Sequence, residues 1–121
     1  TGVRFVIYES ELKVLELLWQ YGEISASKLY KMLEEETGWS KTTSYTIIKR
    51  CIDKGLISKT EPNYLCRANV TKREAQQEGI SELLKKFFNN SYSEFLKSFI
   101  DNEILSEDDI SELKDIVKKL R

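Results

Sequence analysis

The chain of 121 residues contains no histidine, a single proline and only two cysteines, Cys51 and Cys66. The lack of histidine removes the commonest general base of enzymes. Two cysteines alone cannot supply the four ligands of a structural zinc site. Neither a glycine-rich phosphate loop nor a Ser/Cys–His pairing is present. We therefore expect no enzymatic activity, no metal site and no cofactor.

The sequence also lacks a run of 18 apolar residues and a visible signal peptide. These absences predict no membrane insertion and no secretion. Without secretion a disulfide is not expected. Cys51, on the apolar side of a predicted helix, is interpreted as a small buried thiol.

Charge is unevenly distributed, although the net charge is only −1. Residues 39–68 carry six cations and two anions, whereas residues 71–121 carry nine cations and eleven anions. The total argues against a uniformly basic nucleic-acid binder, but the distribution of charge matters more than its sum. The composition, 40% hydrophobic and 32% charged, is that of a folded protein of one or two small domains.

Three apolar stripes at helical spacing predict helices over residues 11–21, 26–37 and 41–54. A serine precedes each helix and can cap it, and a glycine follows each helix. These serines are Ser10, Ser25 and Ser40. Only Gly38-Trp39-Ser40 connects the second helix to the third, a spacing typical of a helix-turn-helix.

The third predicted helix has two chemically different sides. Its apolar side carries Ile47, Ile48, Cys51 and Ile52, with Ser44 among them. Its other side is rich in hydroxyls and cations, the groups that reach base edges and phosphates in a major groove. A solvated amphipathic helix is the alternative. The predicted DNA-contacting residues of this helix are Lys41, Thr42, Thr43, Tyr45, Thr46, Lys49 and Arg50.

Two short runs, residues 56–60 and 64–68, predict a β-hairpin around Glu61-Pro62-Asn63. Three helices followed by one hairpin is the order of a winged helix-turn-helix. We therefore predict a winged-helix DNA-binding domain over residues 9–70. Lys59 and Arg67 are the cations of the hairpin that are placed to touch phosphate. Alternatively, the hairpin merely closes the end of the helical core.

Residues 71–121 predict three further amphipathic helices, which gives a mainly α chain. Thr71-x-x-Glu74 and Ser91-x-x-Glu94 are capping boxes, and Ser106 opens the last helix. A segment of this size cannot easily bury its apolar faces alone. We predict a homodimer, although the helices could instead fold back on the first domain. The predicted dimerisation residues are Ile80, Leu83, Leu84, Phe87, Phe88, Phe95, Leu96, Phe99, Ile100, Ile110, Leu113, Ile116, Val117 and Leu120.

Four segments resemble the penicillinase-repressor family (BlaI/MecI/CopY) in the same order: ELKVLELLW at 11–19, GWSKTT at 38–43, KGLISK at 54–59 and DNEILSEDDI at 101–110. The resemblance implies a cytoplasmic bacterial repressor that dimerises on palindromic operators of antibiotic-resistance or copper-transport genes. It places the recognition contacts on Thr42, Thr43, Thr46 and Arg50.

The chain departs from the family at two positions. In the β-lactam branch a membrane sensor protease system cuts the repressor in an Asn-Phe dipeptide, and the matching position reads Ser98-Phe99. The copper branch carries a cysteine-rich tail, which is not seen after Leu120-Arg121, so metal sensing is not expected. The rival interpretation is a winged-helix module for protein contacts, which a titration with duplex DNA at two salt concentrations distinguishes.

Overall fold

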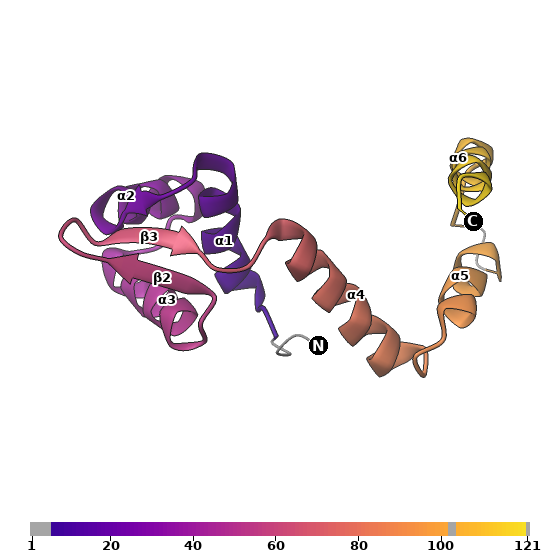
Figure 1. Cartoon of the computed structure of the whole chain (residues 1–121), viewed down its shortest axis with the longest axis horizontal. Helices are drawn as coiled ribbons and strands as arrows, with labels where there is room; N and C mark the ends of the chain where they lie inside the picture. The colour runs from indigo at the N-terminus through magenta and orange to yellow at the C-terminus, as the bar shows by residue number, and fades with distance from the viewer. Residues whose placement is uncertain (1–5, 102–103, 121) are drawn as a thin grey trace. The chain divides into compact units, whose positions relative to one another are not determined.

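The computed structural model describes residues 6–101 and 104–120 (Figure 1). The predicted fold class is confirmed, because a three-helix unit with a small antiparallel sheet precedes further helices. In chain order the elements are α1 (Glu9–Tyr21), β1 (Ile24–Ser25), α2 (Ala26–Thr37), α3 (Lys41–Asp53), β2 (Ile57–Thr60), β3 (Leu65–Ala68), α4 (Lys72–Phe87), α5 (Tyr92–Asp101) and α6 (Glu107–Lys118).

The chain divides into two compact units, Thr1–Gly79 and Ile80–Arg121. The division falls inside α4. The domain boundary predicted between residues 70 and 71 lies at the start of that helix. The first unit contains the three predicted helices and the hairpin.

The predicted caps of α2 and α3 are confirmed. Ser25 Oγ accepts from the Lys28 N–H at 3.3 Å, and Ser40 Oγ accepts from the Thr43 N–H at 3.1 Å. Gly38 closes α2 in the left-handed region, with φ of +79°. That conformation is freely available only to glycine. A short, well-capped link therefore fixes where α3 begins.

The start of α1 differs from the prediction. The helix begins at Glu9, and Tyr8 rather than Ser10 is the N-cap. The reason is the Glu11 carboxylate, which accepts the Tyr8 N–H at 3.0 Å and so satisfies a backbone donor that the helix leaves free. Ser10 lies in the first turn, and its hydroxyl serves another contact, described below.

The predicted hairpin is confirmed, and β1 extends it to a sheet of order β1-β3-β2. The two-residue strand β1 was not predicted, because two residues cannot display a period. It pairs Ile24 with Cys66, and both side chains are buried. The sheet thereby closes the core beneath the helices.

The core of the first unit gathers side chains from α1, α2, α3 and the sheet. On α1 the buried stripe includes Val14 and Leu17, whereas the predicted stripe members Leu12 and Trp19 are only partly buried. Trp19 lies at the edge because its indole N–H donates to the Val70 carbonyl at 2.8 Å. Cys51 and Cys66 are free, buried thiols, as expected for Cys51. Burial raises the pKa of Cys51 to about 12, so this thiol stays protonated.

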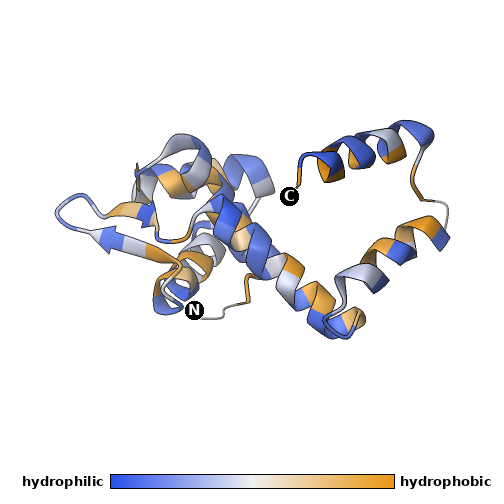
Figure 2. Ribbon diagram, turned by 45° about the vertical axis from the view of Figure 1, so that its right-hand side comes forward, coloured by the Kyte–Doolittle hydropathy of each residue, from blue (hydrophilic) through white to orange (hydrophobic). Residues whose placement is uncertain are grey.

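The second unit keeps its apolar side chains largely exposed. The predicted capping box at Thr71 and Glu74 opens α4 at the end of the first unit, and Ser106 and Asp109 open α6 in the same reciprocal way. Rings of Phe88, Phe95 and Phe99 pack edge to face. Figure 2 shows apolar residues gathered along one side of α5 and of α6.

Candidate nucleic-acid interface

The two predicted sides of α3 are present in the structure. Ser44, Ile47, Ile48 and Cys51 are buried. The predicted DNA-contacting residues of this helix are all exposed, namely Lys41, Thr42, Thr43, Tyr45, Thr46, Lys49 and Arg50. Packing of α3 against α1 and α2 holds the inner side. The outer side therefore presents hydroxyls and cations to solvent.

The hydroxyls of α3 have defined hydrogen-bonding capacity. Thr46 Oγ1 donates to the Thr42 carbonyl at 3.0 Å, which leaves its oxygen free to accept. Thr43 Oγ1 accepts from Ser40 Oγ at 3.1 Å, which leaves its hydrogen free to donate. A hydroxyl has one donor and two acceptor positions. Adjacent turns of α3 thus offer an acceptor and a donor.

Tyr30 on α2 adjoins the start of α3, although its place in the apolar stripe of the helix predicted no function. The Lys41 ammonium lies 5.9 Å from the centre of its ring. Burial raises the pKa of Tyr30, and the neighbouring Cys66 and Tyr45 raise it further. The phenol therefore stays neutral and able to donate a hydrogen bond near pH 7.

Tyr64, at the turn end of the hairpin, was also missed. Its φ of +49° is in the left-handed region, which is uncommon for a bulky residue. Its carbonyl accepts the Ala26 N–H at 3.0 Å, which ties the hairpin to the start of α2. The ammonium of Lys59 lies 4.8 Å from the centre of the Tyr64 ring. The conformation of the turn therefore orients Lys59, one of the two predicted cations of the hairpin, or wing.

The two predicted cations of the wing lie on opposite faces of the hairpin. Lys59 pairs with Cys66, and Arg67 pairs with Ser58. Paired residues of antiparallel strands share a face, and successive residues alternate between faces. The hairpin thus separates Lys59 from Arg67, although both are exposed.

Lys49 forms an exposed ion pair with Asp53, with 3.3 Å between ammonium and carboxylate. Exposed pairs one helical turn apart contribute only about 0.3–0.5 kcal/mol. A phosphate could therefore compete for Lys49 at little cost.

Arg50 and Lys54, at the end of α3, both contact Glu11 of α1. Arg50 Nε lies 2.8 Å from Glu11 Oε2, and Lys54 Nζ lies 2.7 Å from Glu11 Oε1. Arg50 Nη2 also donates to Ser10 Oγ at 2.8 Å. Glu11 is fully buried. Burial raises the pKa of its carboxyl, but hydrogen bonds from Lys54, the Tyr8 backbone and Arg50 outweigh that effect and lower it below 4.5.

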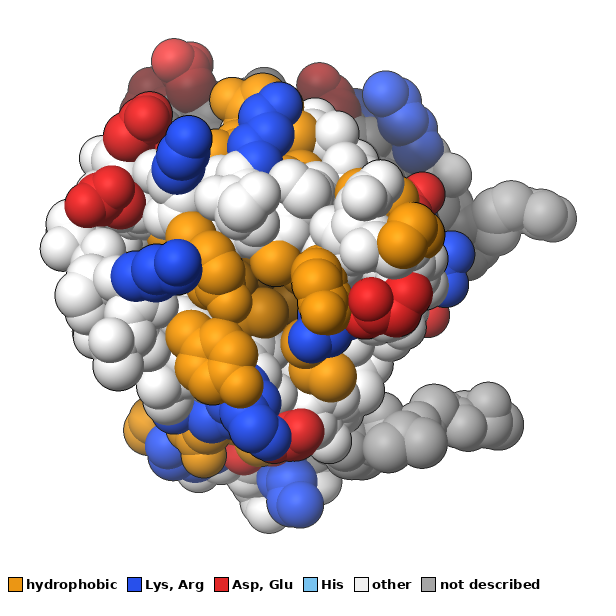
Figure 3. All heavy atoms as spheres, turned by 90° about the vertical axis from the view of Figure 1, so that its left-hand side faces the viewer, with side chains coloured by type: hydrophobic (Ala, Val, Ile, Leu, Met, Phe, Trp, Pro, Cys, Tyr) orange, Lys and Arg blue, Asp and Glu red, His pale blue; other side chains and the backbone are white. Residues whose placement is uncertain are grey.

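Figure 3 shows the end of the first unit where the hairpin turn, α2 and α3 come together. Lysine and arginine side chains are interspersed there with exposed apolar, uncharged polar and several acidic ones. This mixture resembles neither a uniform basic patch nor an acidic surface. It fits a small number of phosphate contacts around a reading helix.

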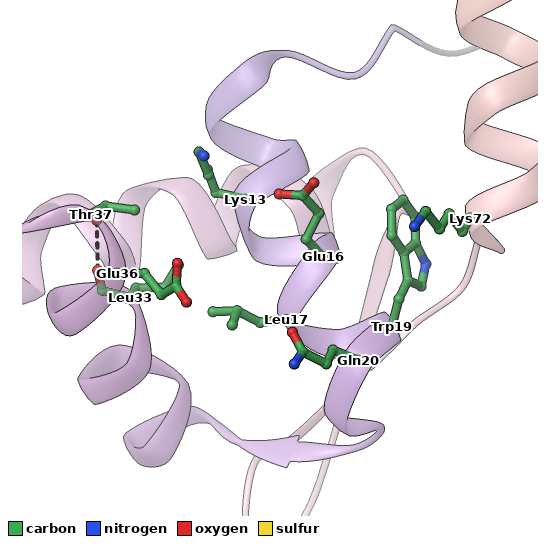
Figure 4. A pocket seen from close by; sticks show the side chains of 9 residues that line it. All are labelled: Lys13, Glu16, Leu17, Trp19, Gln20, Leu33, Glu36, Thr37 and Lys72. Atoms are coloured by element: carbon green, nitrogen blue, oxygen red, sulfur yellow. Dashed lines mark hydrogen bonds between the residues drawn. The ribbon is translucent and has the colours of Figure 1, made fainter. Parts of the chain in front are cut away.

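A cavity of about 470 Å³ opens between α1 and α2 (Figure 4). Its lining carries charges of both signs and, among the described residues, includes none from α3 or the hairpin. The cavity is therefore separate from the surface just described. Its lining residues are Lys13, Glu16, Leu17, Trp19, Gln20, Leu33, Glu36, Thr37 and Lys72.

Within residues 6–101 and 104–120 no group of metal-binding side chains is found. No helix in that part of the chain is long and apolar enough to span a membrane.

The predicted dimerisation residues are mostly uncovered. Leu84 is buried, and Phe88, Phe95 and Phe99 are half-buried. The exposed members are Ile80, Leu83, Phe87, Leu96, Ile100, Ile110, Leu113, Ile116, Val117 and Leu120. An apolar groove of about 460 Å³ runs between α5 and α6 and includes Leu96, Phe99 and Leu113 in its lining.

The predicted cleavage position, Ser98-Phe99, lies inside α5. Ser98 Oγ donates to the Phe95 carbonyl at 2.6 Å, and the Phe99 ring centre lies 5.0 Å from that of Phe95. A peptide bond held in a packed helix becomes accessible to a protease only when the helix opens locally.

Comparison with known proteins gives consistent matches. The profile of a family described as penicillinase repressor matches residues 7–119. A penicillinase repressor of Bacillus licheniformis is 24% identical to this chain. The match covers 93% of this chain and 90% of the relative. The methicillin resistance regulatory protein MecI of Staphylococcus aureus (strain N315) is 24% identical, covering 95% of each chain.

A solved structure shares the fold of the first unit. The solution structure of the DNA-binding domain of the repressor BlaI matches with a TM-score of 0.52 and 21% identity. It covers 60% of this chain and 93% of that domain. At this identity the likeness supports the winged-helix fold.

Proposed function

Because the chain belongs to the penicillinase repressor family, we propose that it is a dimer that binds a palindromic operator through α3. Family membership makes it a DNA-binding transcriptional repressor and not an enzyme. The operator, the dimer and the residues that contact DNA are the parts that we propose.

One observation carries the proposal: α3 buries its apolar side and leaves its hydroxyls and cations outward, directly after a capped three-residue link. In helix-turn-helix proteins the second helix enters the major groove, and its N-terminal residues contact base edges. Thr42, Thr43 and Thr46 occupy the first two turns of α3. They are the proposed readers.

The hydroxyl contacts suggest which base edges suit each threonine. Thr46 retains an acceptor, which suits the amino group of adenine or cytosine. Thr43 retains a donor, which suits guanine O6 or N7, or thymine O4. Both side chains also carry a methyl group that can contact the thymine methyl.

Phosphate contacts would come from α3 and from the hairpin. Lys41 opens α3, Lys49 lies two turns later, and Lys59 extends from the wing. Each phosphate contact adds about one unit to the slope of affinity against salt concentration. Arg67, on the other hairpin face, provides a matched control for Lys59.

Dimerisation is proposed from the uncovered apolar side chains of the second unit. Soluble chains rarely leave so many large apolar residues exposed on neighbouring helices. A second copy presents the same surface, so a twofold interface can cover both. The dimer would set two α3 helices about 34 Å apart, one duplex turn.

Two further features of the proposal come from similarity alone. The repressor would act in the cytoplasm on β-lactam-resistance-type or related genes. A membrane sensor protease system would release it by cutting near Ser98-Phe99, once α5 opens.

The deciding experiment is selection from a random duplex library with the purified chain, followed by sequencing of the retained duplexes. We expect a dyad with two half-sites. Thr46→Val keeps the shape and removes the hydroxyl, so it should relax the preference at one base pair per half-site. Enrichment of no sequence, or of a motif without twofold symmetry, would remove the proposal.

The alternative is a winged-helix module that contacts proteins, which the near-neutral total charge favours. Titrations with the selected duplex at 50 and 200 mM salt separate the two functions. A DNA-binding chain loses affinity steeply between these concentrations. A module for protein contacts shows weak binding at both.

A further inference from the structure

The Glu11 carboxylate joins the end of α3 to α1 and to the segment before it. Its two oxygens accept from Arg50 Nε, Lys54 Nζ and the Tyr8 N–H, at 2.8, 2.7 and 3.0 Å. Lys54 Nζ also donates to the Val6 carbonyl at 2.6 Å. Three segments of the chain therefore meet at one buried carboxylate.

This arrangement differs from the surface ion pairs of the same unit. The Glu11 side chain is 0% exposed, whereas both partners in the Lys49–Asp53 pair are more than half exposed. A carboxylate removed from water requires paired charges and hydrogen bonds. Both oxygens of Glu11 are satisfied, so displacing Arg50 would leave part of a buried charge unpaired.

Two of the five N–H groups of the Arg50 guanidinium are engaged within the chain. A bidentate contact with guanine needs two N–H groups of the fork to point at O6 and N7. In Arg50, Nε donates to Glu11 and Nη2 donates to Ser10. These two contacts hold the guanidinium against α1. Its free N–H groups, on Nη1 and Nη2, could therefore reach a guanine only where this fixed orientation meets the groove.

The position of Arg50 along α3 points the same way. It lies ten residues after the N-cap, Ser40, which corresponds to about 15 Å along the helix axis. Base contacts in helix-turn-helix proteins concentrate near the N-terminus of the recognition helix. Thr42, Thr43 and Thr46 lie there, and Arg50 lies beyond them.

We propose that Glu11 and Arg50 are positioning residues, which lock the C-terminal half of α3 against α1 so that its first two turns meet the groove at a fixed angle. This inference rests on the proposed function. It replaces the base-reading role that the family resemblance implies for Arg50. Lys54 completes this cluster, and we call Glu11, Arg50 and Lys54 together the clamp. Lys54 also attaches the segment before α1 to the clamp.

The test compares base preference with affinity. Selection from the random library is repeated with Arg50→Ala and with Glu11→Gln, and affinity for the wild-type dyad is measured at 10 °C. We expect both variants to retain the same base preferences at every position and to bind all selected duplexes more weakly by one common factor. The double variant should bind no more weakly than Arg50→Ala, because the two residues act together.

Two results would overturn the proposal. If Arg50 reads a base through its free N–H groups, Arg50→Ala loses preference at one base pair per half-site. If the clamp serves stability alone, both variants melt at lower temperature but bind with wild-type affinity at 10 °C. Thr46→Val is the control for a lost base contact.

A second variant keeps the test decisive if single substitutions unfold the chain. Replacing a whole buried ion cluster by apolar residues often preserves stability, whereas removing one member does not. Glu11→Leu/Arg50→Met/Lys54→Met should therefore fold. The clamp predicts unchanged base preferences for it, and loss of preference at one position overturns the clamp. Failure of the wild type to select any dyad would count against the proposed function, a different outcome.

Discussion

Ile100→Ala should weaken the proposed dimer by an amount that the exposure of Ile100 sets. Ile100 is 69% exposed in the single chain. The substitution deletes three carbon groups, worth about 0.8 kcal/mol each when fully buried. Covering the exposed part therefore contributes about 1.6 kcal/mol per copy. The residue occurs twice in a twofold dimer, so the loss is about 3 kcal/mol, or roughly 200-fold in Kd.

Sedimentation equilibrium over a concentration series measures this Kd. Tyr21→Ala is the matched control, because Tyr21 is 58% exposed on α1 and lies outside the predicted dimerisation residues. We expect the control to dimerise like the wild type. A wild-type chain that stays monomeric at micromolar concentration would refute the reasoning. So would an Ile100→Ala variant with an unchanged Kd.

Three other predictions concern the first unit. Ser44→Ala should raise the free energy of unfolding in urea by about 1 kcal/mol, because the buried Ser44 hydroxyl has no partner among the described residues and alanine favours the helix. Lys59→Ala should lower the salt slope of duplex binding by about one unit, with Arg67→Ala unchanged; equal effects would contradict the proposal that only the Lys59 face of the hairpin contacts DNA. Because the pKa of Glu11 is lowered, its stabilisation should be complete above the ordinary value of 4.5 and fall away below it. The urea midpoint of Glu11→Gln should therefore lie below that of the wild type at pH 7, and the two midpoints should converge in acid.

Local signals in the sequence predicted the elements of the first unit well. Ser25 and Ser40 cap their helices as expected, and α2 has the predicted bounds. Such signals work because a cap or a glycine acts within a few residues of itself. The inner side of α3 was equally predictable, since helical spacing alone separates Ile47, Ile48 and Cys51 from the hydroxyls.

Features that depend on distant residues were not predictable from the same signals. Tyr64 looked like an ordinary strand residue, yet its left-handed backbone and its bond to Ala26 depend on where α2 begins. The faces of Lys59 and Arg67 depend on the register of the hairpin. One residue of register moves a side chain to the opposite face, and the hairpin turn alone does not fix that register in the sequence.

Glu11 is the clearest case of a residue whose burial the helical spacing of apolar residues does not predict. A charged residue at the start of α1 reads as a solvated side chain near the positive end of the helix dipole. Its burial follows from two cations that arrive 39 and 43 residues later, from Arg50 and Lys54. The same contacts change the role that we expect for Arg50. In the sequence it is a cation flanking the reading side of a helix, and in the fold two of its N–H groups donate to Glu11 and Ser10 of its own chain. The base preferences of Arg50→Ala therefore decide how far along α3 the DNA-reading surface extends.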